Sequence, residues 1–163
     1  MSFSAITLRP IEDRDETNVI QILTSPLVTK SYMVPDLTPE QAKGLFLRLQ
    51  SLSREENRFV RGICLDDTLV GFLNDTEVTE NYWELGWAMH PDYMGKGYCT
   101  AGVRLAIRAL FDRGVPAVLA GAFDWNIASL RVMEKCGMQK IDRTDSIEYR
   151  GKVHTCVYCL KKQ

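Results

Sequence analysis

The chain has 163 residues, of which 45% are hydrophobic, and this is enough to fill the core of one ordinary domain. Its 20 basic and 21 acidic residues leave a net charge of −1, so no overall positive field attracts nucleic acid or an anionic membrane surface. Because no stretch approaches the roughly 18 apolar residues of a membrane span and the N-terminus lacks a secretory signal, we expect a single cytoplasmic domain over residues 1–163 with no nucleic-acid or membrane partner.

The N-terminal part of the sequence predicts one strand and two helices. Residues 5–9 have the pattern of a short strand. Asp13 or Asp15 can cap the first helix, whose apolar side chains fall within residues 19–23. The sequence Thr-Pro-Glu-Gln at residues 38–41 is a sharper start signal, because Thr can cap, Pro suits the first turn and Gln completes a capping box.

A loop and a three-stranded meander are predicted next to these helices. Residues 25–36 contain two prolines, an aromatic residue and a methionine, which is typical of a loop that either forms a substrate wall or covers the core. Residues 59–65, 69–78 and 82–89 have the pattern of consecutive strands with short connections. The first half of the chain therefore predicts the order strand, two helices and three strands.

The second half alternates helices and strands. Helical periodicity begins near residue 99 and ends around residues 113–114, and the nearly uninterrupted apolar run 115–123 predicts a buried strand. A second helix is expected from Asn126 to a stop at Gly137. Two final strands, around residues 139–149 and 153–160, complete the chain.

The most informative motif is the turn Gly95-Lys96-Gly97-Tyr98, which joins a strand to a helix. The first amides of a helix have no intrahelical acceptor, the helix dipole is positive there, and glycines let a phosphate approach the backbone. The alternative is that the two glycines form only a tight connection between the strand and the helix and bind no ligand. A P-loop would need Gly-Lys-Ser/Thr, and a dinucleotide fingerprint would need a third glycine where Thr100 stands, so neither ATP nor NAD is favoured.

The cysteines and histidines do not predict a metal site. Five cysteines are an odd number in apolar surroundings, which favours reduced core thiols. Cys156 and Cys159 have Cys-x-x-Cys spacing, but they fall in a predicted strand, where residues three apart point to opposite faces. The isolated His90 is interpreted as a structural residue, and no metal is expected.

Residues 85–138 combine the motif Leu-Gly-Trp-Ala-Met-His-Pro-Asp-Tyr-Met-Gly-Lys-Gly-Tyr with Asn-x-x-Ser and Glu-Lys-Cys-Gly-Met. This combination resembles the GNAT superfamily of acetyl-CoA-dependent N-acetyltransferases, in particular the branch of the ribosomal-protein N-terminal acetyltransferases. The resemblance covers about the last 80 residues by motif and the whole chain by element order. It implies an α+β fold with a central mixed, mostly antiparallel twisted sheet of about six to seven strands flanked by about four helices.

The resemblance implies acetyl-CoA as co-substrate. Its pyrophosphate would rest on the glycine turn, and its pantetheine arm would pair with the preceding strand, whose N–H groups near Met89 could hold an oxyanion. Asn126 would lie beside the pantetheine and Ser129 near the thiol, although a plain N-cap and a small first-turn residue are the alternative interpretation. The implied cofactor-binding residues are Trp87, Ala88, Met89, Gly95, Lys96, Gly97, Tyr98, Cys99, Thr100, Asn126 and Ser129.

Two residues are candidates for catalysis. An amine must lose a proton to act as a nucleophile, and Glu84 matches the acidic position that many family members carry in this strand. The alternative is that Glu84 is the solvent-facing member of an alternating strand, with Glu77 and Glu80 as nearby substitutes. Ser129 is the second catalytic candidate, beside the thiol. Trp125 is the tryptophan expected to line the acceptor cleft.

Three positions depart from the family pattern. Asp92 puts a carboxylate near the phosphates, Ala101 removes an acidic residue after the turn, and Met133 replaces a tyrosine that often protonates the leaving thiolate. Tyr98 and Ser129 are weaker proton donors. The primary hypothesis is transfer of an acetyl group to a primary amine, either a protein N-terminus or a small molecule, in a ternary complex. The alternatives are a catalytically silent acyl-CoA-binding regulatory domain and a nucleotide-binding domain, and exposed sheet edges would allow a homodimer.

Overall fold

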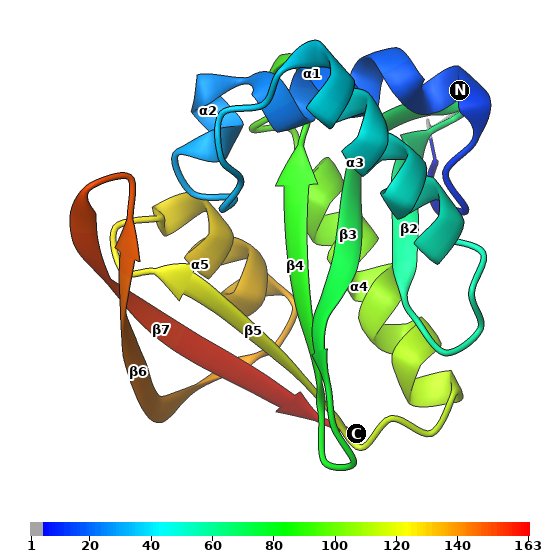
Figure 1. Cartoon of the computed structure of the whole chain (residues 1–163). Coiled ribbons are helices and arrows are strands. Elements are labelled where there is room, and N and C mark those ends of the chain that lie inside the picture. The colour runs from blue at the N-terminus through cyan, green and yellow to red at the C-terminus, as the bar shows by residue number, and fades with distance from the viewer. Residues whose placement is uncertain (1–4) are drawn as a thin grey trace.

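A computed structural model describes residues 5–163; residues 1–4, which the predicted domain includes, lie outside the described residues. The described range contains seven strands, five α-helices and two 3-10 turns, and no helix in it is both long and apolar enough to cross a bilayer (Figure 1). In chain order the elements are β1 (Ile6–Arg9), η1 (Asp13–Asp15), α1 (Glu16–Thr24), α2 (Pro26–Thr29), α3 (Pro39–Leu52), β2 (Val60–Leu65), β3 (Thr68–Val78), β4 (Trp83–Met89), η2 (Pro91–Tyr93), α4 (Tyr98–Asp112), β5 (Ala117–Phe123), α5 (Ile127–Lys135), β6 (Gln139–Tyr149) and β7 (Lys152–Lys162).

The strands form one sheet in the order β1-β2-β3-β4-β5-β7-β6. All neighbouring strands are antiparallel except β4 and β5, which run parallel. Within the described residues, β4 and β5 pair only at Trp83 with Val118 and at Glu84 with Leu119, and beyond these pairs they diverge (Figure 1). The predicted mixed, mostly antiparallel sheet is confirmed, and it contains a wedge-shaped opening between two central strands.

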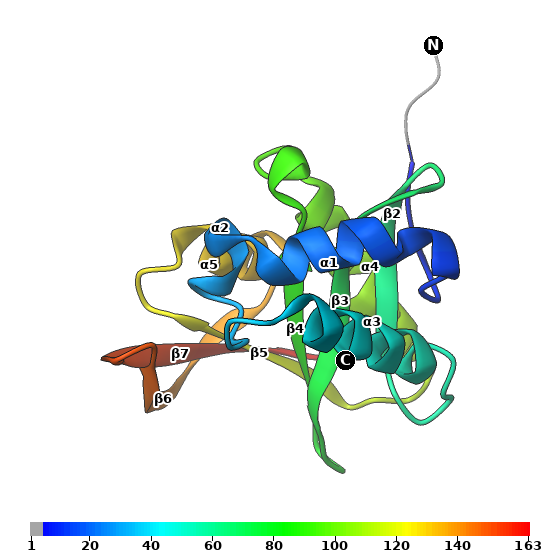
Figure 2. The same ribbon diagram turned by 45° about the horizontal axis from the view of Figure 1, so that its top comes forward.

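Helices cover both faces of this sheet. On one face α4 and α5 bury residues such as Val103 and Met133 in a common core. On the other face α1 and α3 cross strands β2 to β4, as Figure 2 shows, and bury Ile22 and Phe46. A third cluster, on the same side of the sheet as α1 and α3, is made of strand residues, which include Leu119, Phe123, Cys156 and Tyr158.

Of the two N-terminal helices with predicted caps, α3 begins with the predicted capping interaction and α1 does not. At the start of α3, Thr38 and Gln41 form the predicted capping box: Thr38 Oγ1 accepts a hydrogen bond from Gln41 N at 3.2 Å, and Gln41 Oε1 accepts one from Thr38 N at 2.9 Å. At the start of α1 the prediction of a carboxylate cap is wrong. Asp15 occupies the N-cap position, but its carboxylate is paired with Arg9 at 2.7 Å instead, because a buried carboxylate needs a charged partner.

The Cys-x-x-Cys pair lies as strand alternation predicts. Cys156 belongs to the cluster formed by β5 and β7, whereas Cys159 packs into the core under α4 and α5, on the opposite face of β7. All five cysteines are free. Two thiols on opposite faces of one strand cannot bind the same ion or form a disulfide with each other.

A substitution at Gly71 on β3 can test how tightly the sheet is packed beside the opening between β4 and β5. It pairs with Met89, and a Cβ at this position would lie 2.7 Å from the carbonyl oxygen of Ala88. Because that carbonyl is fixed in the sheet, Gly71→Ala is expected to lower the free energy of unfolding by about 1–3 kcal/mol. Gly44→Ala is the control, since Gly44 lies in α3 with nothing within 4 Å, and it is expected to raise stability by about 0.5–1 kcal/mol. Urea denaturation measures the free energy of unfolding of both variants. Equal changes in the two variants would contradict tight packing at Gly71.

Candidate active site

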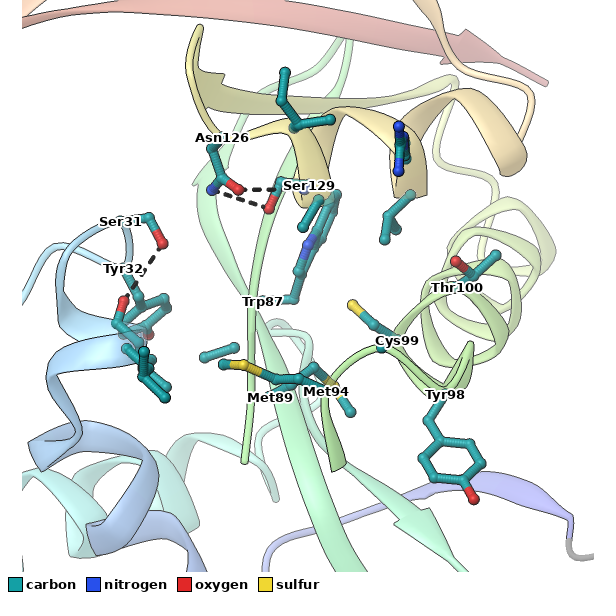
Figure 3. Close-up of a pocket in the computed structure, with 18 of the residues that line it drawn as sticks. Ser31, Tyr32, Trp87, Met89, Met94, Tyr98, Cys99, Thr100, Asn126 and Ser129 are labelled. Atoms are coloured by element: carbon teal, nitrogen blue, oxygen red, sulfur yellow. Dashed lines mark hydrogen bonds between the residues drawn. The ribbon is translucent and has the colours of Figure 1, made fainter. Parts of the chain in front are cut away.

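A pocket of about 580 Å³ opens where β4 and β5 diverge. Its walls come from both sides of the sheet: the glycine turn, α4 and α5 on one side, and α2 with the residues after it on the other. Figure 3 places Ser31 and Tyr32 on one side of the pocket and Asn126 and Ser129 on the other, with the Trp87 ring beside Ser129. One molecule can therefore enter from each face of the sheet, and the two can meet in the opening.

The turn before α4 has the geometry of an anion cradle. Gly95 and Gly97 have φ angles of +73° and +82°, in the left-handed region that favours glycine. Gly97 is also the N-cap of α4; no side chain caps this helix, and a Cβ at either glycine would meet nothing within 4 Å. Ala101 N donates to Gly97 O, so the amides of residues 98–100 precede the regular helix bonds and point out of its positive end. All the turn residues line the pocket.

Charge on this side of the pocket also suits an anion. Lys96, Arg131 and Lys135 line it, and none of the described lining residues is Asp or Glu. The side chain of Asp92 is 82% exposed and lies outside the lining, because the 3-10 turn η2 directs it into solvent. Buried His90 shapes that turn by accepting a hydrogen bond from Asp92 N at 3.1 Å. Although Asp92 departs from the family pattern, its carboxylate therefore does not lie beside the anion cradle formed by the glycine turn.

β4 forms one wall through the three predicted residues Trp87, Ala88 and Met89. Trp87 and Met89 contact the core under α4 and α5, whereas Ala88 packs on the side of α1 and α3. Since β5 has already diverged here, the backbone groups of this segment that face β5 are available to an extended ligand. Cys99 lies opposite, with its sulfur toward Trp87 (Figure 3), and burial raises the pKa of its thiol to about 12.

Asn126 and Ser129 form a hydrogen-bonded pair at the start of α5. Asn126 Oδ1 accepts a hydrogen bond from Ser129 N at 3.3 Å, and Asn126 Nδ2 donates to Ser129 Oγ at 3.2 Å (Figure 3). Asn126 is therefore the N-cap of α5, as the alternative interpretation of the sequence predicts. Both Asn126 and Ser129 also line the pocket. The cap orients the serine hydroxyl at the pocket wall.

The two other positions considered for a proton donor are less suitable. Met133 is fully buried in the core under α4 and α5 and is not part of the pocket lining. Tyr98 lies at the edge of the pocket, but its ring points away from Trp87 (Figure 3). Of the two hydroxyls named from the sequence as proton donors, Ser129 is the one directed toward the interior of the pocket.

Glu84 lies at the vertex of the opening rather than in the pocket lining. It is in register with Leu119 at the last β4–β5 pair, three residues before Trp87 and thus about 10 Å along the strand. Its side chain is half-buried and accepts a hydrogen bond from Thr76 Oγ1 at 2.9 Å. Burial raises the pKa of this carboxyl above its ordinary value, although the Thr76 bond acts in the opposite direction. Alternation along β4 puts Glu84 on the same side as Ala88, which is the side of α2.

Two residues that the sequence analysis did not identify hold the α2 side of the pocket in place. The loop predicted before α3 contains α2, which corrects that prediction, and it is attached to the tip of the β6–β7 hairpin. The Tyr149 hydroxyl donates to the carbonyl oxygens of Thr29 and Val34, the latter at 3.0 Å. Arg150 donates to the Val34 carbonyl and to Asp36 Oδ1, both at 2.8 Å. No sequence pattern reports these contacts, because they join segments far apart in the chain.

Comparisons with known proteins agree with this geometry. The sequence model of the acetyltransferase (GNAT) domain family matches residues 5–139. The uncharacterized N-acetyltransferase YnaD of Bacillus subtilis (strain 168) is 26% identical over 137 residues, which are 83% of this chain and 79% of that protein.

Solved structures show the same fold. An acetyltransferase (GNAT family) from Bacillus anthracis has a TM-score of 0.82 at 20% identity, over 98% of this chain and 96% of that one. The ribosomal L7/L12 alpha-N-protein acetyltransferase RimL, solved in complex with coenzyme A, has a TM-score of 0.84 at 14% identity, over 99% and 95% of the two chains. Because the family match spans most of the sequence and includes both the glycine turn and the Asn-x-x-Ser segment, the chain belongs to the GNAT acetyltransferase family and is an N-acetyltransferase.

Proposed function

We propose that residues 1–163 act as one domain that binds acetyl-CoA in the pocket between β4 and β5. The observation that carries this proposal is a pocket lined from both faces of the sheet, with an uncapped helix start and three cations on one side. The amides of residues 95–100 would hold the pyrophosphate, and the backbone of residues 87–89 would pair with the pantetheine arm. Bound there, acetyl-CoA supplies the activated acetyl group, and RimL, which shares the fold, binds coenzyme A.

The acceptor is a primary amine, either a protein N-terminus or a small molecule, that enters from the α2 side. Its nitrogen attacks the thioester carbonyl carbon, a C–N bond forms, the C–S bond breaks, and the products are an acetamide and CoA. Backbone N–H groups of residues 87–89 stabilise the oxyanion, and Glu84, which lies about 10 Å along β4 from Trp87, accepts the amine proton through intervening water. The Ser129 hydroxyl donates a hydrogen bond to the departing thiolate, which is already a tolerable leaving group because thiols have a pKa near 8.5. The thiolate then takes up a proton from solvent, and Glu84 releases to solvent the proton that it accepted.

Direct transfer between the two bound substrates is favoured over an acetylated enzyme intermediate. Cys99 is the one thiol among the described lining residues, and its raised pKa keeps it protonated and therefore a poor nucleophile. The Ser129 hydroxyl is bonded to the Asn126 amide, which cannot act as a base.

Two measurements test the proposed function. Calorimetry is expected to show CoA binding with roughly micromolar affinity, with no comparable binding of ATP or NAD. A thiol-release assay with acetyl-CoA is then run over small amines, N-terminal peptides and aminoglycosides, and at least one class is expected to give release that depends on the amine. CoA binding without release from any acceptor would support the silent acyl-CoA-binding alternative, and undetectable CoA binding would contradict both.

A further inference from the structure

The two ends of the pocket differ in chemistry. The end formed by the glycine turn and α5 carries cations, whereas the α2 end is mostly apolar, with Leu27, Val28 and Tyr32 on one side and Trp125 and Ile127 on the other. Leu27, Trp125 and Ile127 are also among the exposed large apolar side chains, at 57%, 41% and 52% exposure. Large apolar side chains left exposed around a cavity are characteristic of a surface that binds an apolar group.

The ring of Trp125 is held in one orientation by neighbouring aromatic residues. Its indole Nε1 donates to His154 Nδ1 at 3.0 Å. The rings of His154 and Phe123 stack with centroids 4.5 Å apart, and the Phe123 centroid is 5.7 Å from that of Trp125. The wall is therefore formed before any ligand arrives, which lowers the entropic cost of binding.

Tyr32 is held in the same way on the opposite wall. Its ring meets Phe72 edge to face, with centroids 5.5 Å apart, and its hydroxyl donates to Asn74 Oδ1 at 3.1 Å. Burial raises the pKa of this phenol, so it stays uncharged at neutral pH. Both walls thus offer fixed, neutral aromatic surface.

The charges around this end do not suit a polycation. Lys30 lines it, and no Asp or Glu occurs among the described residues of the pocket wall. Asp36, which follows α2, is paired with Arg150 at 2.8 Å. Glu84 lies at the vertex, on the α2 side of β4, where it would face the reacting amine itself. Among the described residues that line this end, a second ammonium group on the acceptor would therefore meet Lys30 and no carboxylate.

We propose that the acceptor carries a flat apolar group beside its reacting amine and no second cation, and that this group binds between the walls formed by Tyr32 and Trp125. The inference rests on the proposed function, and it names the chemical class of the amine. It makes Trp125 a specificity residue rather than a catalytic one, because the residue would contact the apolar group and not the reacting atoms.

The test compares three primary amines at one saturating acetyl-CoA concentration: phenethylamine, ethylamine and spermidine. The kcat/KM for phenethylamine is expected to exceed that for ethylamine by about tenfold or more, with spermidine no better than ethylamine. Trp125→Ala is expected to lower the phenethylamine-to-ethylamine ratio about tenfold, and Trp125→Phe to retain most of it. Val153→Ala is the matched control, since Val153 is 72% exposed on β7 away from the pocket, and it should leave the ratio unchanged.

The outcomes separate this inference from the function on which it rests. Release that favours spermidine, or a ratio that Trp125→Ala leaves intact, would overturn the apolar acceptor while acetyl transfer stands. Failure of every amine together with absence of CoA binding would overturn the function and the inference with it. Near-ultraviolet circular dichroism of the Trp125 variants checks that the fold is kept, so a lost ratio is read only from folded protein.

Discussion

Glu84→Gln is expected to lower kcat by roughly 100- to 10,000-fold while the affinity for CoA stays the same. Glutamine has nearly the same shape and can keep the hydrogen bond with Thr76, but it cannot accept a proton from an amine. The position of Glu84, at the last pair before β4 and β5 diverge, puts the carboxylate at the closed end of the opening and away from the proposed phosphate cradle. The measurement is steady-state thiol release, paired with calorimetric titration of CoA.

The pH dependence provides a second readout for Glu84. Burial raises the pKa of its carboxyl above the ordinary 4.5, and only the deprotonated form acts as a base. The rate of the wild-type protein is therefore expected to rise with pH through that raised pKa, and the rise should disappear in Glu84→Gln. Glu80→Gln removes the same charge in the β3–β4 turn and serves as the control. An equal loss of rate in Glu80→Gln or Glu77→Gln would move the base away from Glu84.

Local sequence signals predicted the fold where the interactions themselves are local. The Thr38–Gln41 capping box and the glycine turn depend on residues within a few positions of each other, and both are confirmed. Alternation along β7 likewise predicted that Cys156 and Cys159 occupy opposite faces. The carboxylate cap of α1 was wrong because Asp15 is used by Arg9, a partner from another element that helix-start rules do not consider.

The site was predictable where backbone geometry defines it and less so where distant segments meet. The predicted cofactor residues from 87 to 100, with Asn126 and Ser129, all line one pocket. The divergence of β4 and β5 depends on strand pairing across the sheet, and the attachment of α2 depends on the hairpin tip at Tyr149 and Arg150. Neither feature leaves a periodic pattern in the sequence.

Gly97→Ala should weaken CoA binding by about tenfold to a hundredfold, through two separate effects. A Cβ is strained at a φ of +82°, so the turn tends to change shape, and this costs roughly 1–2 kcal/mol. The Cβ would also project into open space, since nothing lies within 4 Å of it, and in the proposed complex that space belongs to the phosphates. Isothermal titration calorimetry with CoA measures the loss of affinity, and thermal denaturation measures the loss of folding stability.

The matched control is Gly114→Ala, at the C-terminal end of the same helix. Gly114 has a φ of +88° and equally open surroundings, so the backbone strain is the same, but the residue lies outside the pocket. Both variants are expected to lose similar stability, and only Gly97→Ala should lose affinity for CoA. Equal loss of affinity in the two variants would mean that strain in α4, rather than a phosphate cradle at its start, explains the effect. Loss confined to Gly97→Ala would instead place the phosphates at the positive end of α4, because strain alone is common to both glycines.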